Sequence, residues 1–139
     1  MTARLRRPGL ELGIDLPDAM RVEQTGERVA ASRPGARLDL TAEPAFAEAP
    51  QSTARAVAQH LARLPAARVL DAADAELAGA AGTRVLLHHA GDEGATCLEE
   101  WRAVVGGLLV TLSVQCAAPA YDALADAHAA AAASLRREP

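Results

Sequence analysis

Two cysteines, one histidine and one glutamate are the residues of this chain whose types and spacing could support chemistry. Cys97 and Cys116 are its only cysteines, and His89 and Glu99 lie close to the first of them in sequence. Thiolate sulfur and imidazole nitrogen are common zinc ligands, and a thiolate beside a histidine can act as a nucleophile. A second interpretation is a redox or disulfide role for the two cysteines. The third is two small buried thiols beside a half-exposed histidine, because cysteine is among the residues most often buried.

The elements that must position these residues lie between Thr83 and Gln115, a segment that predicts three strands joined by two tight turns. Gly106-Gly107 is typical of a two-residue hairpin connection, in which both central residues must tolerate a positive φ. The pairs that this turn predicts are Val105–Leu108, Ala103–Val110, Trp101–Leu112, Glu99–Val114 and Cys97–Cys116. One face of the two strands is then apolar and the other mostly polar, as a correct register requires.

The earlier turn, Asp92-Glu93-Gly94, favours a three-residue loop with Gly94 in the left-handed conformation. The pairs that this loop predicts are Gly91–Ala95, His89–Cys97, Leu87–Glu99 and Val85–Trp101. His89 and the two cysteines then become neighbours on one face, with Glu99 one step along it. A carboxylate on an apolar face is unfavourable, so we expect Glu99 either to reach water near the end of the sheet or to line a pocket.

The remaining elements follow from hydrophobic periodicity and from prolines and glycines. The predicted strands span residues 10–16, 28–33, 37–42 and 68–77, with a short one at 20–22. The first predicted helix runs from Ser52 or Thr53 to about Leu64, and the second runs from Pro119 to about Arg136. The inner side of the first helix is predicted to be Ala54, Val57, Ala58, Leu61 and Leu64, and that of the second Tyr121, Leu124, Ala125, His128, Ala131, Ala132 and Leu135. Residues 1–9 are expected to be a flexible basic N-terminus, followed by a single domain over 10–137.

Several landmarks of this order are shared with a known fold family. They are the strand closed by Leu16-Pro17, the helix 52–64, the Leu77-Ala78-Gly79 step, the Glu100-Trp101 strand, the Gly106-Gly107 hairpin into 110–113, and the closing helix from Tyr121-Asp122-Ala123-Leu124 to Ser134-Leu135-Arg136. With them the chain resembles the PsbP-like, Mog-type α/β/α sandwich family, which includes bacterial proteins of unknown function. The resemblance implies an α+β fold, an antiparallel β-sheet flanked by helices, and adaptor-like binding of partners without a shared catalytic motif.

Composition excludes several classes of function. A net charge of −4 and only three aromatic residues among 139 argue against nucleic-acid binding by phosphate contacts or base stacking. No apolar run is long enough to span a membrane, and no secretory h-region follows the basic start, so we expect a cytoplasmic protein. The phosphate-loop, dinucleotide, metalloprotease and nucleophile-elbow motifs are absent from the sequence, so we expect no enzyme activity and no cofactor.

The favoured hypothesis is therefore a non-catalytic protein-binding adaptor or chaperone-like protein, with a possible link to secretion. Its working surface would be the open sheet face or the groove beside the last helix, with Trp101, Tyr121 and Leu124 as the partner-binding face. One alternative is a small thiol- or metal-dependent enzyme that uses His89, Cys97 and Cys116. The other is a structural subunit of a homodimer, whose interface would be flat and self-complementary.

Overall fold

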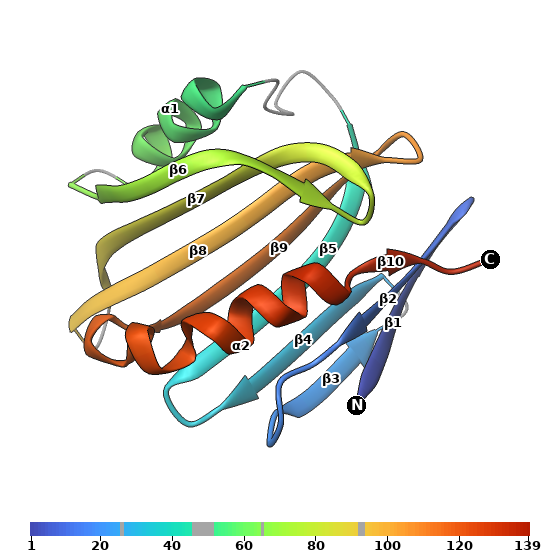
Figure 1. The fold of residues 1–139 in the computed structure, drawn as a ribbon, viewed down its shortest axis with the longest axis horizontal. Coiled ribbons are helices and arrows are strands. Elements are labelled where there is room, and N and C mark those ends of the chain that lie inside the picture. Colours follow the sequence, from blue (N-terminus) through green and yellow to red (C-terminus); the bar gives the residue numbers. More distant parts are fainter. Residues whose placement is uncertain (26, 46–51, 65, 92–93) are drawn as a thin grey trace.

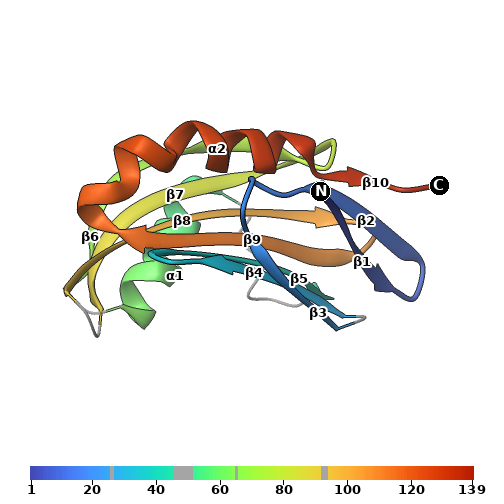
Figure 2. The same ribbon diagram turned by 90° about the horizontal axis from the view of Figure 1, so that it is seen from below.

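A seven-stranded antiparallel sheet, with one helix on each face, forms the body of the protein (Figures 1 and 2). The computed structural model describes residues 1–139 except 26, 46–51, 65 and 92–93. The strands of this sheet, in spatial order, are β3 (Arg21–Thr25), β4 (Arg28–Arg33), β5 (Ala36–Pro44), β9 (Leu108–Ala117), β8 (Gly94–Val105), β7 (Ala80–Gly91) and β6 (Arg68–Leu77). Helix α1 (Thr53–Arg63) contacts β6 and β7 on one face, and α2 (Tyr121–Ser134) follows the single turn η1 (Ala118–Ala120) across the other.

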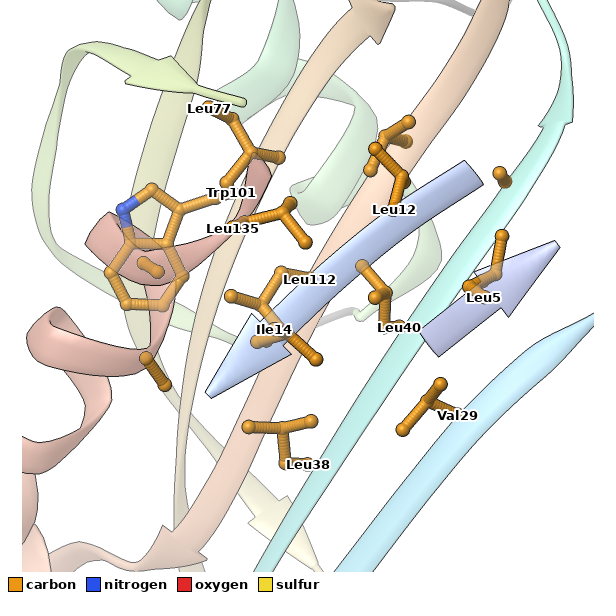
Figure 3. Close-up of a cluster of buried hydrophobic side chains, with 14 of the residues drawn as sticks. Leu5, Leu12, Ile14, Val29, Leu38, Leu40, Leu77, Trp101, Leu112 and Leu135 are labelled. Carbon is orange, nitrogen blue, oxygen red and sulfur yellow. The ribbon is translucent and has the colours of Figure 1, made fainter. Parts of the chain in front are cut away.

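A second, three-stranded sheet shares the face of α2. It consists of β1 (Thr2–Arg7), β2 (Leu10–Asp15) and β10 (Arg136–Arg137), with β2 in the middle. The main hydrophobic core lies between this layer and the large sheet, where Leu12 and Ile14 meet Leu40 and Leu112 (Figure 3). Burial of each such side chain contributes about 1.5–3 kcal/mol. The small sheet and the large sheet thus enclose the main core on the α2 face, and a smaller cluster around Cys97 and Cys116 lies on the same face under the start of α2.

The register of β8 against β9 confirms the predicted hairpin. Cys97 lies opposite Cys116, and Trp101 lies opposite Leu112 with both side chains in the main core. Gly106 and Gly107 have φ values of +58° and +79°, which an L-residue with a side chain rarely adopts. The two glycines therefore fix the alignment of the following ten pairs.

The predicted register of β7 against β8 is wrong by one residue. Gly91 lies opposite Gly94, so that His88, not His89, faces Cys97. The predicted three-residue loop includes Asp92 and Glu93, which lie outside the described residues, but the pairing leaves only those two positions between the strands. Because strand side chains alternate, the shift moves His89 to the α1 face.

The N-terminal segment also differs from its prediction. Instead of a flexible tail, Thr2–Arg7 forms β1, paired antiparallel with β2. Ala3 and Leu5 are buried while Arg4 and Arg6 are exposed, so the segment has the alternation of a strand with one wet face. Two of the basic residues that suggested a tail, Arg4 and Arg6, are the solvent side of this strand.

Both predicted helices are confirmed, although their details differ. Ser52 caps α1 by accepting a hydrogen bond from the Arg55 amide, as predicted. The buried residues of α1 are Ala56 and His60. Val57 and Leu64 of the predicted inner side pack against the sheet, whereas its other three members are exposed, Leu61 by 42%. Helix α2 ends at Ser134 rather than near Arg136, because the chain then pairs with β2 as β10.

Candidate functional site

The predicted thiol or metal cluster does not form. Cys97 and Cys116 are free, buried and opposite one another, with Glu99 farther along the same face of β8. His89 lies opposite Thr96 and therefore projects from the other face. Within the described part of the chain, no three histidine, cysteine, aspartate or glutamate side chains are arranged to hold a metal ion.

The two thiols also lack the electrostatics of a reactive cysteine. Burial, together with the nearby Cys116 and Glu99, raises the pKa of Cys97 to about 12. Burial and the charge of Glu99 likewise raise the pKa of Cys116. A nucleophilic or metal-binding cysteine needs a lowered pKa, so this pair has the character of core residues.

The predicted partner-binding face is mostly buried. Trp101 is only 5% exposed, and the guanidinium of Arg84 lies 5.8 Å from its ring centroid. Tyr121 and Leu124 are partly buried and pack against the cluster that contains both cysteines. These three side chains support the attachment of α2 and do not form an open surface.

Glu99 is buried and does not reach water, and it is not among the residues that line the two cavities described below. It is 3% exposed, Arg84 Nε donates to its Oε2 at 2.7 Å, and the Tyr121 hydroxyl donates to the same oxygen at 3.0 Å. His128 of α2 places Nδ1 3.6 Å from Oε1. Burial alone would raise the pKa of Glu99, but the contacts with His128 and Arg84 outweigh it, so the pKa is lowered.

Glu100, the next residue, forms a comparable cluster on the opposite face. It is 7% exposed, and its Oε1 lies 2.5 Å from Arg102 Nε, 3.3 Å from His60 Nε2 and 3.8 Å from Arg63 Nη2. His60 Nδ1 donates to the carbonyl of Ala56 at 2.9 Å, so it is Nε2 that faces the carboxylate. Burial opposes ionisation here too, but the contacts with His60 and Arg102 leave the pKa of Glu100 lowered.

Sequence reasoning placed Glu100 on a wet face and did not identify this cluster. Its signal was present, because His60 lies on the same side of α1 as Ala56, one helical turn away. The hydrophobic pattern instead favoured the side that carries Leu61. A buried histidine–glutamate pair across two elements cannot be recognised until the strand and the helix have been placed together.

The α1 face of the sheet carries a surface groove, which we call the open-face groove. It consists of two adjoining cavities of about 700 and 630 Å³, both lined by Arg102 and Leu109. The first cavity, of about 700 Å³, is lined by Thr41, Glu43, Pro44, Gln59, Ala62, Arg63, Glu100, Arg102, Leu109 and Thr111. The second cavity, of about 630 Å³, is lined by Ser52, Asp74, Ala75, Glu76, Ala81, Gly82, Thr83, Arg102, Ala103, Val104 and Leu109.

Val104 gives this groove an exposed apolar side chain. It is 46% exposed and lies directly opposite Leu109 on the neighbouring strand. Two charged groups that line the groove, the buried Glu100 and the half-buried Arg102, already bind one another. The groove is therefore suited to binding a ligand by apolar and shape contacts, because these two charges are already paired with one another.

None of the described helices is long and apolar enough to cross a membrane.

No protein-family model matches this chain, and no curated protein sequence matches it either. Several solved structures, in contrast, match the fold of this chain. Cyanobacterial PsbP (CyanoP) from Synechocystis sp. PCC 6803 is 14% identical with a TM-score of 0.69, over 99% of this chain and 92% of that one. LpqN of Mycobacterium tuberculosis, described as involved in cell envelope biogenesis, is 16% identical with a TM-score of 0.63, over 100% and 91%.

The Ran-binding protein Mog1p of Saccharomyces cerevisiae shares the architecture as well. It is 8% identical with a TM-score of 0.62, and the match covers 98% of this chain and 95% of that one. Identities this low carry the fold and no residue-level correspondence. The three matches, each over at least 91% of both chains, therefore show a shared fold. The chain has the PsbP- and Mog-like fold, an α+β sandwich, as the order of its sequence elements predicted.

Proposed function

We propose that this chain is a non-catalytic protein-binding adaptor or chaperone-like protein whose partner binds in the open-face groove. The observation that carries the proposal is the exposed Val104 beside Leu109 on the floor of a surface groove. An apolar floor between polar walls is typical of a site that binds a partner by shape and by removal of water.

The state of the ionisable groups supports binding over catalysis. A general acid or base must be free to exchange a proton with a substrate. Glu99 and Glu100 are instead held by arginines, and the two thiols have raised pKa values. Mog1p, which shares the fold, is described as a Ran-binding protein, so the same architecture serves protein binding elsewhere.

The cytoplasm is the compartment that we propose for this activity, and a role linked to secretion is its proposed setting. Cys97 and Cys116 face one another as free thiols, and a reducing compartment keeps such a pair reduced. A maleimide that increases the mass of each modified thiol tests this. It is added to the cells at the moment of lysis and denaturation, so that it traps the thiols before they can oxidise. Two modified cysteines per chain are expected, whereas an oxidised pair would place the protein in an oxidising compartment.

Site-specific photo-crosslinking tests the binding surface. A photoreactive amino acid replaces Val104 in one variant and Leu61 in a matched control, because Leu61 is similarly exposed (42%) but lies on α1 outside the groove. In the native cell we expect the Val104 variant alone to give a discrete adduct with another protein. Equal crosslinking at both positions would overturn the proposal, and so would an adduct only with a second copy of this chain.

A further inference from the structure

A row of side chains crosses the open-face groove at right angles to its strands. Glu76 of β6 lies opposite Ala81 of β7, and Val104 of β8 lies opposite Leu109 of β9. Gly82 and Ala103 are paired, so Ala81 and Val104 occupy the next position of the same two strands. Because neighbouring strands are about 4.8 Å apart, Glu76 and Val104 stand about 10 Å from one another.

Charge is unevenly distributed along this groove. In the first cavity, Arg63 and Arg102 are balanced by Glu43 and Glu100. In the second, Asp74 and Glu76 stand beside Val104, and the basic residue that lines this cavity, Arg102, is already paired with Glu100. Asp74 accepts a hydrogen bond from the uncharged Thr53 hydroxyl, which leaves its negative charge in place.

The β6 end of the groove is therefore acidic and its floor is apolar. From this we infer that the partner presents an extended segment in which a basic residue lies two positions from an apolar one. The apolar side chain covers Val104 and Leu109, and the basic side chain reaches Asp74 and Glu76. Residues two apart in an extended segment share a face and are about 6.8 Å apart, and the length of an arginine or lysine side chain spans the remaining distance.

Three observations support a partner of this chemistry. The apolar and acidic groups belong to one cavity, so a single segment can contact both. Glu76 is an exposed side chain at the sheet edge, so a basic residue can approach it without displacing a buried group. The chain carries a net charge of −4, which accelerates association with basic partners.

This inference rests on the proposed function, and short peptide probes separate the two. The probe is fluorescein-labelled Gly-Arg-Ala-Leu-Ala-Arg-Gly, whose symmetric arrangement of arginines makes the direction of binding unimportant. One comparison peptide has glutamate at both arginine positions, and another has serine in place of leucine. Affinity is measured by fluorescence anisotropy at low and high salt, and the site is located by NMR shifts of the ¹⁵N-labelled chain.

We expect the arginine–leucine peptide to bind most tightly, with shifts at Val104 and Leu109, and salt to weaken it. Glu76→Gln should weaken binding about twofold to fivefold, the range of one exposed ion pair. Glu76→Arg should abolish the preference, because the remaining charge of Asp74 is then offset and the arginine and glutamate peptides bind about equally. Asp126→Arg, a charge reversal at an exposed position of α2, is the matched control and should leave the preference unchanged.

Equal affinity of the wild-type chain for the arginine and glutamate peptides would overturn this partner chemistry, as would an equal effect of the two charge reversals. If Val104 still gives a specific adduct in the cell, that result leaves the protein-binding function standing with a partner of different charge. If the peptides behave as expected but Val104 gives no specific adduct, the groove recognises basic segments and the adaptor function fails. Each variant is judged by its own ratio of peptide affinities, so a modest loss of stability does not obscure the answer.

Discussion

Glu99 and Glu100 are consecutive on β8, yet each carboxylate is buried against a histidine of a different helix. Glu99 faces His128 of α2, and Glu100 faces His60 of α1. Successive strand residues point to opposite faces, so these two adjacent residues of β8 each contact one of the two helices. The two glutamates therefore tie the outer layers of the sandwich to its central strand.

Removing the charge of Glu100 should destabilise the protein markedly. Glu100→Gln leaves Arg102 and His60 buried without a carboxylate, and we expect the free energy of unfolding to fall by about 2–3 kcal/mol. Urea denaturation followed by the fluorescence of Trp101 measures this, because the single tryptophan is buried when folded. Glu43→Gln, at an exposed position of β5, is the control, with an expected change within about 0.5 kcal/mol. Equal effects of the two substitutions would contradict the buried pairing.

Stability should also decrease at acidic pH. The pKa values of Glu99 and Glu100 lie below the ordinary value of 4.5 in the folded protein, so the unfolded chain binds protons first as the pH falls. Their stabilising contribution is complete above the unfolded value and is lost as the pH falls through the lowered folded values. Carbon-13 NMR titration of the glutamate carboxyl groups tests this directly.

In that titration the exposed carboxyl group of Glu23 is the comparison for the two buried ones. Its resonance is identified as the one that disappears in a Glu23→Gln variant. Two carboxyl resonances should titrate below the others and should disappear in Glu99→Gln and Glu100→Gln respectively. Titration of all glutamates together near the ordinary value would show that the buried ion pairs do not form in solution. Unfolding measured in urea between neutral and acidic pH should show the matching loss of stability in the wild type.

These clusters show where the sequence was uninformative about the site. The pattern of β8 placed Glu99 on an apolar face and Glu100 on a wet one. At these two positions both faces are in fact covered, because α1 lies over Glu100 and α2 over Glu99, although the α1 face is open farther along β8 at Val104. Which helix residues meet a strand is decided by tertiary packing, and the alternation of one strand contains no information about it. His60 and His128 could therefore be seen in the sequence but could not be matched to their glutamates.

Native Cys97 and Cys116 should react slowly with thiol reagents. Burial raises the pKa of Cys97 to about 12, so almost none of it is thiolate at neutral pH, and its side chain is almost inaccessible. Ellman's reagent should modify neither cysteine in the folded protein and both after denaturation. A Cys97→Ser variant identifies the reacting residue if one does react. Rapid modification of the native protein would restore the thiol-enzyme alternative.

The fold itself could be predicted to the extent that turns constrain register. Gly106-Gly107 permitted only a two-residue connection, and every predicted pair of β8 with β9 is present. The turn before β8 could be read as two or three residues long. Val85 and Leu87 did not resolve this choice, because both faces of β7 carry buried apolar residues, and Leu86 could replace either of them. Where both faces of a strand are covered, alternation cannot exclude a shift of one residue.

The dependence of this hairpin on glycine can be measured at Gly107. Its φ of +79° is left-handed, and a side chain there would meet no other atom within 4 Å, so any cost of substitution is conformational. Gly107→Val should lower the free energy of unfolding by about 1–2 kcal/mol, whereas Gly107→Asn should cost less, because asparagine tolerates this conformation. Urea denaturation of the two variants gives the difference. If valine and asparagine are equally tolerated, the turn has another conformation in solution, and the register that places Cys97 opposite Cys116 loses its principal support.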